Sequence, residues 1–239
     1  MTWSIVIHEP ENGAFAVAVT TCSFAVGASC PHLRAGVGAV STQSFTNRYL
    51  GPAVLDGMAR GLPPAAAIEG ALAGDEGRHL RQVHAVDRFG RSAAFTGANC
   101  VDWAGDRTGR NQSVAGNMLA GPAVLHDTLA ALAINGGTPL PERLALALEA
   151  GEAAGGDRRG RQSAAMRLVT TEDFPDLDIR VDDHPEPLKE LSRLLAIWRR
   201  DRAPYLDRQP RKGNPSGVVD MDATEAAWRA AGMDLRFRR

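Results

Sequence analysis

The sequence predicts an α+β fold in which antiparallel sheets are covered by helices in separate layers. Three observations lead to this prediction: the chain opens with a β-hairpin pattern, two helical patterns follow, and this order of hairpin and helices then occurs again. The 239 residues, 44% of them hydrophobic, are enough for one large core. We expect a main domain over residues 1–200 and a C-terminal extension over residues 201–239, where Arg, Asp, Pro and Gly become frequent.

The first hairpin is predicted over residues 2–8 and 14–21. Both segments are rich in β-branched and aromatic residues, and a turn containing Pro10, Asn12 and Gly13 separates them. Thr2 follows the initiator methionine, and a small second residue permits methionine removal. An amino-terminal threonine is a nucleophile with its own base, because its α-amino group has an ordinary pKa of about 7.7 to 8.0. Taken alone, Thr2 does not establish catalysis, because an ordinary strand can also begin at a threonine after the initiator methionine.

The later elements follow from hydrophobic periodicity and from glycine and proline positions. Residues 22–34 show no clear period and are expected to form a loop or irregular strand, whereas residues 35–43 have the small-residue pattern of a tightly packed strand. A polar connection is expected over 99–111, and a charged, glycine-rich loop over 155–162. Strands are further predicted at 82–86, 92–96, 112–121, 163–170 and 179–181, and helices at 47–61, 63–74, 122–133, 142–154, from 187, and at 223–231.

Composition argues against several classes of protein. Lys and Arg number 27 against 28 Asp and Glu, so nothing global attracts nucleic acid or an anionic membrane. The three cysteines are an odd number without C-x-x-C spacing, which indicates a reducing compartment. Without a signal-peptide pattern or a long apolar run, we expect a cytoplasmic protein. Neither His84 nor His184 has a second ligand at metal spacing, so we expect no metal and no cofactor.

Seven segments, in this order, resemble the bacterial DUF1028 family: MTWSI (1–5), AGVGAV (35–40), AFTG (94–97), DWAG (102–105), GNMLAG (116–121), AGGDRRGRQSA (154–164) and VDDHP (181–185). The resemblance covers roughly residues 2–198. It implies an N-terminal-nucleophile (Ntn) hydrolase fold related to proteasome β-subunits, a four-layer αββα sandwich of two antiparallel sheets. It also implies Thr2 as the nucleophile, with Asp157 and Ser163 beside the amino terminus. Proteasome-like subunits use a lysine there, and neither Lys189 nor Lys212 stands in a matching place.

Further site residues are expected around Thr2. A strand from Ser163 that ran beside the first strand would bring Asp157 and Arg161 to Thr2 as a pair, with Asp157 orienting the amine and Arg161 binding a substrate carboxylate. Asn117 is a candidate oxyanion donor. The alternative for Asn117 is a turn residue with positive φ, because it follows a glycine.

Two further residues and one rival nucleophile complete the candidates. Ser41 and Gln43 are candidates for lining the substrate pocket, the alternative being that they cap a strand. Cys100 is a rival nucleophile. Its alternative is a small buried residue that anchors a loop.

The sequence therefore predicts an amidohydrolase acting on a small amide or peptide-like compound. The opposing prediction is a non-catalytic binding or assembly protein that keeps the fold, which the missing lysine favours. The C-terminal extension and the residues just before it offer scattered large apolar side chains, Trp198, Tyr205, Trp228 and Phe237, that need a surface to pack on. We expect the extension to pack on the main domain or on a second copy, which gives a homodimer or larger assembly.

Overall fold

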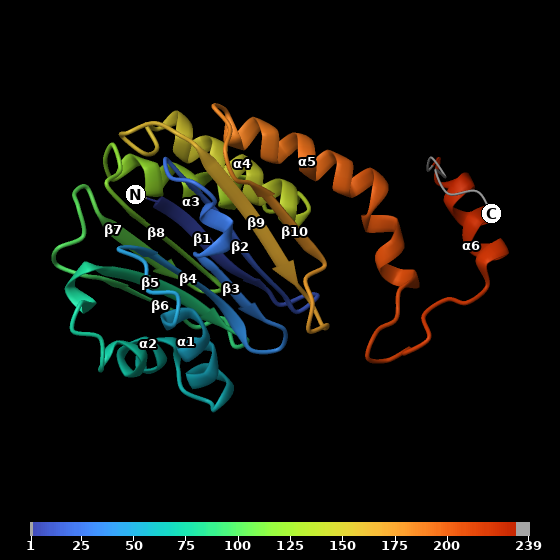
Figure 1. Cartoon of the computed structure of the whole chain (residues 1–239), viewed down its shortest axis with the longest axis horizontal. Coiled ribbons are helices and arrows are strands. Elements are labelled where there is room, and N and C mark those ends of the chain that lie inside the picture. Colours follow the sequence, from blue (N-terminus) through green and yellow to red (C-terminus); the bar gives the residue numbers. More distant parts are fainter. Residues whose placement is uncertain (1, 233–239) are drawn as a thin grey trace. The chain divides into compact units, whose positions relative to one another are not determined.

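The computed structural model describes residues 2–232. The chain separates into two compact units, residues 1–192 and 193–239. The first unit contains a six-stranded sheet in the order β10-β9-β2-β1-β8-β7 and a four-stranded sheet in the order β3-β4-β5-β6 (Figure 1). Every neighbouring pair in both sheets is antiparallel. The strands are β1 (Thr2–Glu9), β2 (Ala14–Thr21), β3 (Pro31–Arg34), β4 (Gly38–Ser44), β5 (Arg81–Asp87), β6 (Ser92–Thr96), β7 (Gly105–Gly109), β8 (Gln112–Asn117), β9 (Ser163–Val169) and β10 (Leu177–Val181).

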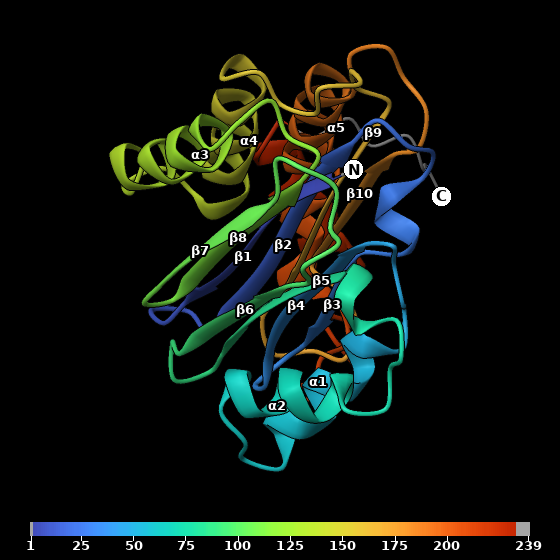
Figure 2. The same cartoon turned by 90° about the vertical axis from the view of Figure 1, so that its left-hand side faces the viewer.

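The two sheets lie face to face between two pairs of helices. Helices α1 (Leu50–Ala59) and α2 (Pro64–Leu72) pack on the four-stranded sheet, and α3 (Ala123–Ile134) and α4 (Leu140–Ala153) pack on the six-stranded sheet (Figure 2). In the interior, β1 contacts β4 and β5 contacts β8. The predicted α+β sandwich of two antiparallel sheets is confirmed.

The first hairpin forms the centre of the six-stranded sheet, as its pattern predicts. β1 pairs with β2 on one side and with β8 on the other, and all but its last residue are buried. Gly13 takes a φ of 71° in the connecting turn, which glycine adopts without steric cost. The side chains alternate: the Trp3 indole lies against α4 at Gly151, whereas Val6 packs with residues of the opposite sheet. A strand covered on both faces needs this near-continuous burial.

Two details differ from the sequence-based expectation, while β3 agrees with the strand alternative for residues 22–34. The first difference is β7, which occupies part of the predicted polar connection. It is an edge strand, and an edge strand needs little apolar alternation because solvent reaches it. The second difference concerns β9, which pairs with β2 and not with β1. The prediction that the strand from Ser163 runs beside the first strand is therefore wrong.

The second unit begins inside α5 (Pro187–Asp201) and contains the 3₁₀ helix η3 (Ala203–Arg208) and α6 (Met221–Ala230). The rings of Tyr205 and Trp228 lie 4.1 Å apart between centroids, and Arg208 donates to the Thr224 hydroxyl at 2.8 Å. η3 and α6 therefore contact each other within this unit. Phe237 lies outside the described residues. Over residues 2–232, no helix combines the length and apolar character needed to cross a membrane.

Candidate functional site

The candidate site lies at the edge of the sandwich where β1 begins, called here the Thr2 edge. The strand registers, with the bond from Gln43 to Thr2, bring to this edge the starts of β1, β5 and β9 and the ends of β2, β4 and β8. Thr2 pairs with Asn117, Thr21 pairs with Ser163, and Gln43 pairs with Gln82. Residues far apart in the sequence therefore meet around the start of the chain.

Thr2 is buried, and both its hydroxyl and its carbonyl have partners. Thr2 Oγ1 donates to Thr21 Oγ1 at 3.3 Å. The Thr2 carbonyl accepts from Gln43 Nε2 and from Asn117 Nδ2, each at 3.4 Å. The sequence analysis missed Thr21, although the hairpin contains the signal: β1 and β2 pair Trp3 with Thr20, so one further step places Thr2 opposite Thr21.

Asp157 supports the end of β2 next to Thr21. Its Oδ2 accepts from the Cys22 backbone N–H at 2.8 Å, and its Oδ1 accepts from the Arg159 backbone N–H at 2.8 Å. The Arg159 guanidinium lies 3.3 Å from Oδ2, and only 1% of the Asp157 side chain is exposed. Because Cys22 follows Thr21, these bonds connect Asp157 to the hydroxyl partner of Thr2 through the backbone.

The predicted pair of Asp157 and Arg161 is wrong. Arg161 Nε lies 3.4 Å from Glu152 Oε1, on the side of α4. The turn after Asp157 explains the difference: Gly160 has a φ of 109°, and its N–H donates to the Asp157 carbonyl at 2.9 Å. This turn leaves Arg159, two residues from Asp157, beside the carboxylate, and directs Arg161 elsewhere.

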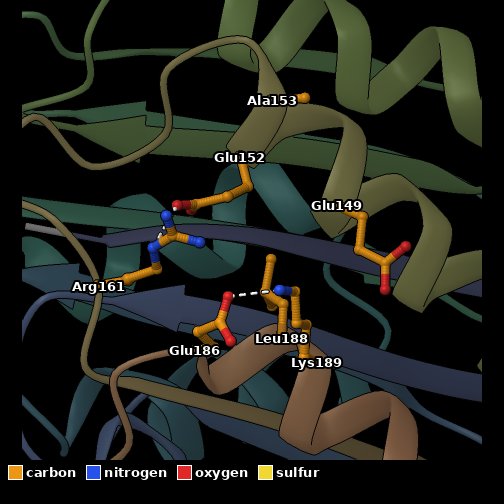
Figure 3. Close-up of a pocket in the computed structure, with 7 residues that line it drawn as sticks. All are labelled: Glu149, Glu152, Ala153, Arg161, Glu186, Leu188 and Lys189. Atoms are coloured by element: carbon orange, nitrogen blue, oxygen red, sulfur yellow. Dashed lines mark ion pairs between the residues drawn. The ribbon is translucent and has the colours of Figure 1, made fainter.

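Arg161 lines a cavity of about 400 Å³ between α4 and the start of α5 (Figure 3). The other lining residues are Glu149, Glu152, Ala153, Glu186, Leu188 and Lys189. Two further carboxylates of the cavity have partners. Glu186 pairs with Lys189 at 2.5 Å, and Glu149 accepts a hydrogen bond from Ser192 Oγ at 3.0 Å. Burial raises the pKa of Glu152, which Arg161 opposes.

Ser163 anchors the loop that follows β2. Its hydroxyl donates to the Ser23 carbonyl at 2.6 Å and accepts from the Val26 N–H at 3.1 Å, and its carbonyl accepts from Thr20 Oγ1 at 3.0 Å. The side chain is fully buried. These contacts hold residues 23–26 against β9, so the contacts of Ser163 are structural and do not reach Thr2.

Ser41 and Gln43 point into the interior between the sheets. The Ser4 hydroxyl lies 3.0 Å from Ser41 Oγ and 2.6 Å from Gln43 Oε1, and His84 Nε2 lies 2.7 Å from the same hydroxyl. Ser41 and Gln43 have no exposed surface, so the predicted pocket-lining role does not agree with their position. Their alternate inward-facing positions on β4 account for this burial.

The sequence analysis also missed Ser4, Gln82 and Ser113, which join the same interior network. The His84 ring is fully buried, and its Nδ1 lies 3.0 Å from Ser113 Oγ. Burial lowers the pKa of His84 to about 3, so this ring is neutral near pH 7. The available signal was a polar residue at an inward position of an otherwise apolar strand.

Asn117 does not have the geometry of an oxyanion donor. Its Nδ2 carries two hydrogens, and these are directed to Gln82 Oε1 at 2.9 Å and to the Thr2 carbonyl at 3.4 Å. The turn alternative is also wrong, because the positive φ, 53°, belongs to Met118. Asn117 instead ties the end of β8 to the start of β1.

Two of the three cysteines, Cys30 and Cys100, are buried. Cys100 is 7% exposed, and its thiol donates to the Arg81 carbonyl at 3.3 Å, in agreement with a buried loop anchor. Burial raises the pKa of Cys30 to about 12, which keeps it a thiol. Within residues 2–232, no group of three His, Cys, Asp or Glu side chains is arranged to hold a metal ion.

Comparison with known proteins places the chain in a family. A crystal structure of a DUF1028 protein from Silicibacter pomeroyi is similar to 92% of this chain and 96% of its own, with 30% identity and a TM-score of 0.85. Anbu (ancestral beta-subunit) from Yersinia bercovieri aligns over 82% of this chain and 96% of its own at 10% identity and a TM-score of 0.34, a level that carries no argument. No curated protein matches. Residues 2–191 match DUF1028, a family of unknown function, and the chain belongs to this family.

Proposed function

We propose that the protein is an N-terminal-nucleophile amidohydrolase in which Thr2, after removal of Met1, attacks the carbonyl of a small amide or peptide-like compound. One observation carries the proposal: Thr2 begins the central strand of the six-stranded sheet, with its hydroxyl bonded to Thr21 and its carbonyl bonded to two buried amides. A residue that only starts a strand needs no such set of partners. The Ntn placement of the fold is part of the proposal.

The chemistry uses the two groups of one residue. Thr2 Oγ1 forms a bond to the substrate carbonyl carbon while its proton passes to the Thr2 amine. The C–N bond then breaks, and the ammonium returns the proton to the leaving amine. Water attacks the resulting ester, the amine again takes and returns a proton, and the products are a carboxylic acid and free Thr2.

Asp157 and Arg159 set the electrostatics of this site in the proposal. A carboxylate near the Thr2 ammonium would raise the amine pKa and weaken the base, and an adjacent guanidinium offsets that effect. Arg159, which lies 3.3 Å from the carboxylate, supplies this guanidinium. Asp157 then acts as a positioning residue, because its bond to Cys22 N–H holds Thr21 beside Thr2.

The second candidate is a binding or assembly protein that lacks catalysis. The position of the lysines favours it: Lys189 pairs with Glu186 in the cavity beside α4, and Lys212 belongs to the second unit. The two candidates differ in the reactivity that they predict for Thr2.

The test is chemical labelling with β-propiolactone, an electrophile small enough to make few demands on pocket shape. Adducts on the Thr2 peptide are measured by mass spectrometry in folded protein and in the same protein unfolded in urea. The proposal predicts labelling at least about tenfold faster in the folded state, because the folded site aligns hydroxyl and base. Thr2→Ser keeps this enhancement and Thr2→Ala loses it. Equal labelling rates in folded and unfolded wild-type protein would contradict the amidohydrolase proposal and favour the second candidate, the binding or assembly protein.

A further inference from the structure

Three buried primary amides meet behind Thr2, and one of them lies at the centre. Gln43, Gln82 and Asn117 come from β4, β5 and β8, and none is more than 2% exposed. Gln82 Oε1 accepts from Gln43 Nε2 and from Asn117 Nδ2, both at 2.9 Å. The same two nitrogens donate to the Thr2 carbonyl. Gln82 therefore contacts both groups that hold Thr2, and its hydrogen bonds reach Thr2 through them.

The orientation of the Gln82 amide is determined by its other partners. Gln82 Nε2 lies 2.8 Å from the Gly116 carbonyl and 3.1 Å from the Gly105 carbonyl, and both of these groups only accept. It also lies 3.0 Å from Thr96 Oγ1, whose hydrogen is donated to Asp106 at 2.7 Å. A reversed amide would place an oxygen against three acceptors. The oxygen of Gln82 must therefore face Gln43 and Asn117.

This orientation fixes the two neighbouring amides in turn. Gln43 and Asn117 must present nitrogen to Gln82 Oε1, which leaves their second hydrogens for main-chain carbonyls. For Asn117 the second acceptor is the Thr2 carbonyl, and for Gln43 the Thr2 and Ala115 carbonyls share it, at 3.4 and 3.1 Å. The direction of both side-chain bonds to the Thr2 carbonyl thus depends on Gln82.

We propose that Gln82 is a positioning residue for the Thr2 nucleophile. The inference rests on the proposed function and adds a residue to it. Gln82 does not contact the reacting atoms: it orients Gln43 and Asn117, these hold the Thr2 carbonyl, and the held peptide plane sets the direction in which the Thr2 amine and hydroxyl leave the strand. Misplacement of a nucleophile by about 1 Å can slow a reaction about a hundredfold.

The test compares two variants that each disturb a fully buried hydrogen-bond network. Gln82→Met keeps the approximate length of the side chain and removes its polar atoms. Ser113→Ala is the matched control, since Ser113 is equally buried but bonds to His84 and not to the amides around Thr2. The rate of β-propiolactone labelling of Thr2 is measured from pH 6 to pH 9, beside the unfolding free energy of each protein.

A positioning role predicts that Gln82→Met lowers the labelling rate at least about tenfold and shifts its pH profile toward that of the unfolded chain. Ser113→Ala keeps the wild-type rate within about twofold and keeps the profile, whatever stability it loses. Where Gln82→Met does not fold, Thr96→Val removes one acceptor of Gln82 Nε2 and is expected to lower the rate about threefold, a smaller loss because two carbonyl acceptors remain.

The outcomes separate the two claims. Wild-type protein labelled no faster folded than unfolded overturns the proposed function, and the role of Gln82 with it. Fast wild-type labelling with unchanged rate and pH profile in Gln82→Met, or in Thr96→Val where that variant is used, overturns the positioning role alone. Equal losses in Gln82→Met and Ser113→Ala also overturn it, because they indicate a structural effect of any buried polar loss.

Discussion

The interior between the two sheets has two halves of opposite character. Toward the Thr2 edge it holds Ser4, Ser41, Gln43, Gln82, His84, Ser113 and Asn117, all within one hydrogen-bonded network. Toward the other end it holds an apolar cluster of Val6, Phe15, Val17, Ala39, Val86 and Val169. The same strands build both halves: β1 contributes Ser4 and Val6, and β5 contributes His84 and Val86. A step of two residues along either strand therefore leads from the polar half of the interior to the apolar half.

The two halves have different physical roles. Burial of apolar surface is non-directional and supplies most of the folding free energy. A buried hydrogen bond adds only about 0.5 to 1.5 kcal/mol net, but an unsatisfied partner costs about 1 to 3 kcal/mol, so a polar network restricts the arrangements that the chain can adopt. We infer that the apolar half holds the sheets together and that the three amides of the polar half, Gln43, Gln82 and Asn117, set positions at the Thr2 edge.

The largest expected effect on stability comes from the apolar half. Phe15→Ala removes a side chain that is 1% exposed and should lower the free energy of unfolding by about 3 to 5 kcal/mol, measured by urea denaturation. Phe24→Ala is the control, because Phe24 is 71% exposed and its loss should change stability by less than about 0.5 kcal/mol. Similar values for the two variants would contradict the role of the apolar half.

The polar half should make stability depend on pH through His84. Its pKa is lowered to about 3 in the folded protein, from an ordinary value of 6.5. The unfolded chain therefore binds a proton below pH 6.5 that the folded protein refuses, and stability falls as the pH falls through that range. Between pH 7 and pH 5 this effect amounts to about 2 kcal/mol.

The measurement is urea denaturation of wild-type protein and His84→Gln at both pH values. The variant keeps hydrogen-bonding groups without the titration, so its loss between pH 7 and pH 5 should be smaller by about 2 kcal/mol. His8 and His32, whose pKa values burial also lowers, act equally in both proteins and cancel. Parallel pH dependences would show that His84 is not buried as a neutral ring.

A further loss of stability is expected at the buried Asp157, beside Thr21. Asp157→Asn keeps the shape of the side chain but removes the charge that faces Arg159 and the Cys22 N–H. The amide nitrogen also cannot accept the backbone N–H that the replaced oxygen accepts, so stability should fall by about 1 to 3 kcal/mol. Thr2 labelling should slow as well, since Thr21 loses support. An unchanged rate of Thr2 labelling would show that Asp157 is not a positioning residue of the site.

The smallest effect is expected outside the Thr2 edge. Arg161 is 47% exposed on its side chain and pairs with Glu152 at 3.4 Å. Arg161→Gln should lower stability by about 0.5 kcal/mol or less, because solvent and salt screen such a pair. Thr2 labelling should not change. A slowed Thr2 reaction in this variant would restore Arg161 to the site and weaken the contrast with Arg159.

The sequence was sufficient for the parts of the fold that depend on local patterns. Alternation and the glycine turn predicted β1 and β2, and apolar spacing with prolines predicted α1 to α4. β7, with the sequence GDRTG, has no such pattern, because an exposed edge strand is held by its neighbour's backbone. The order of strands was also out of reach locally, since the pairing of β9 with β2 depends on the packing of the whole sheet.

The candidate site shows the same division. Thr2 followed from its position and chemistry, and Thr21 could have followed from the hairpin register. The choice of Arg159 over Arg161 depends on a turn with positive φ at Gly160, which the composition of a glycine-rich loop does not specify. Gln82 stands out only as a polar residue in an apolar strand, and its role could not be predicted, because its partners come from four other strands that meet only in the folded sandwich.

The central claim is that Thr2 carries the reactive amine, and the mass of the intact protein tests it most directly. Native protein, purified without an added N-terminal segment, is measured by mass spectrometry, and its first residue is read by N-terminal sequencing. The account predicts a mass lower than that of the full sequence by one methionine residue, and threonine in the first cycle. A mass that includes Met1, with methionine in the first cycle, would contradict the account, because the Thr2 nitrogen would then be an amide without basicity.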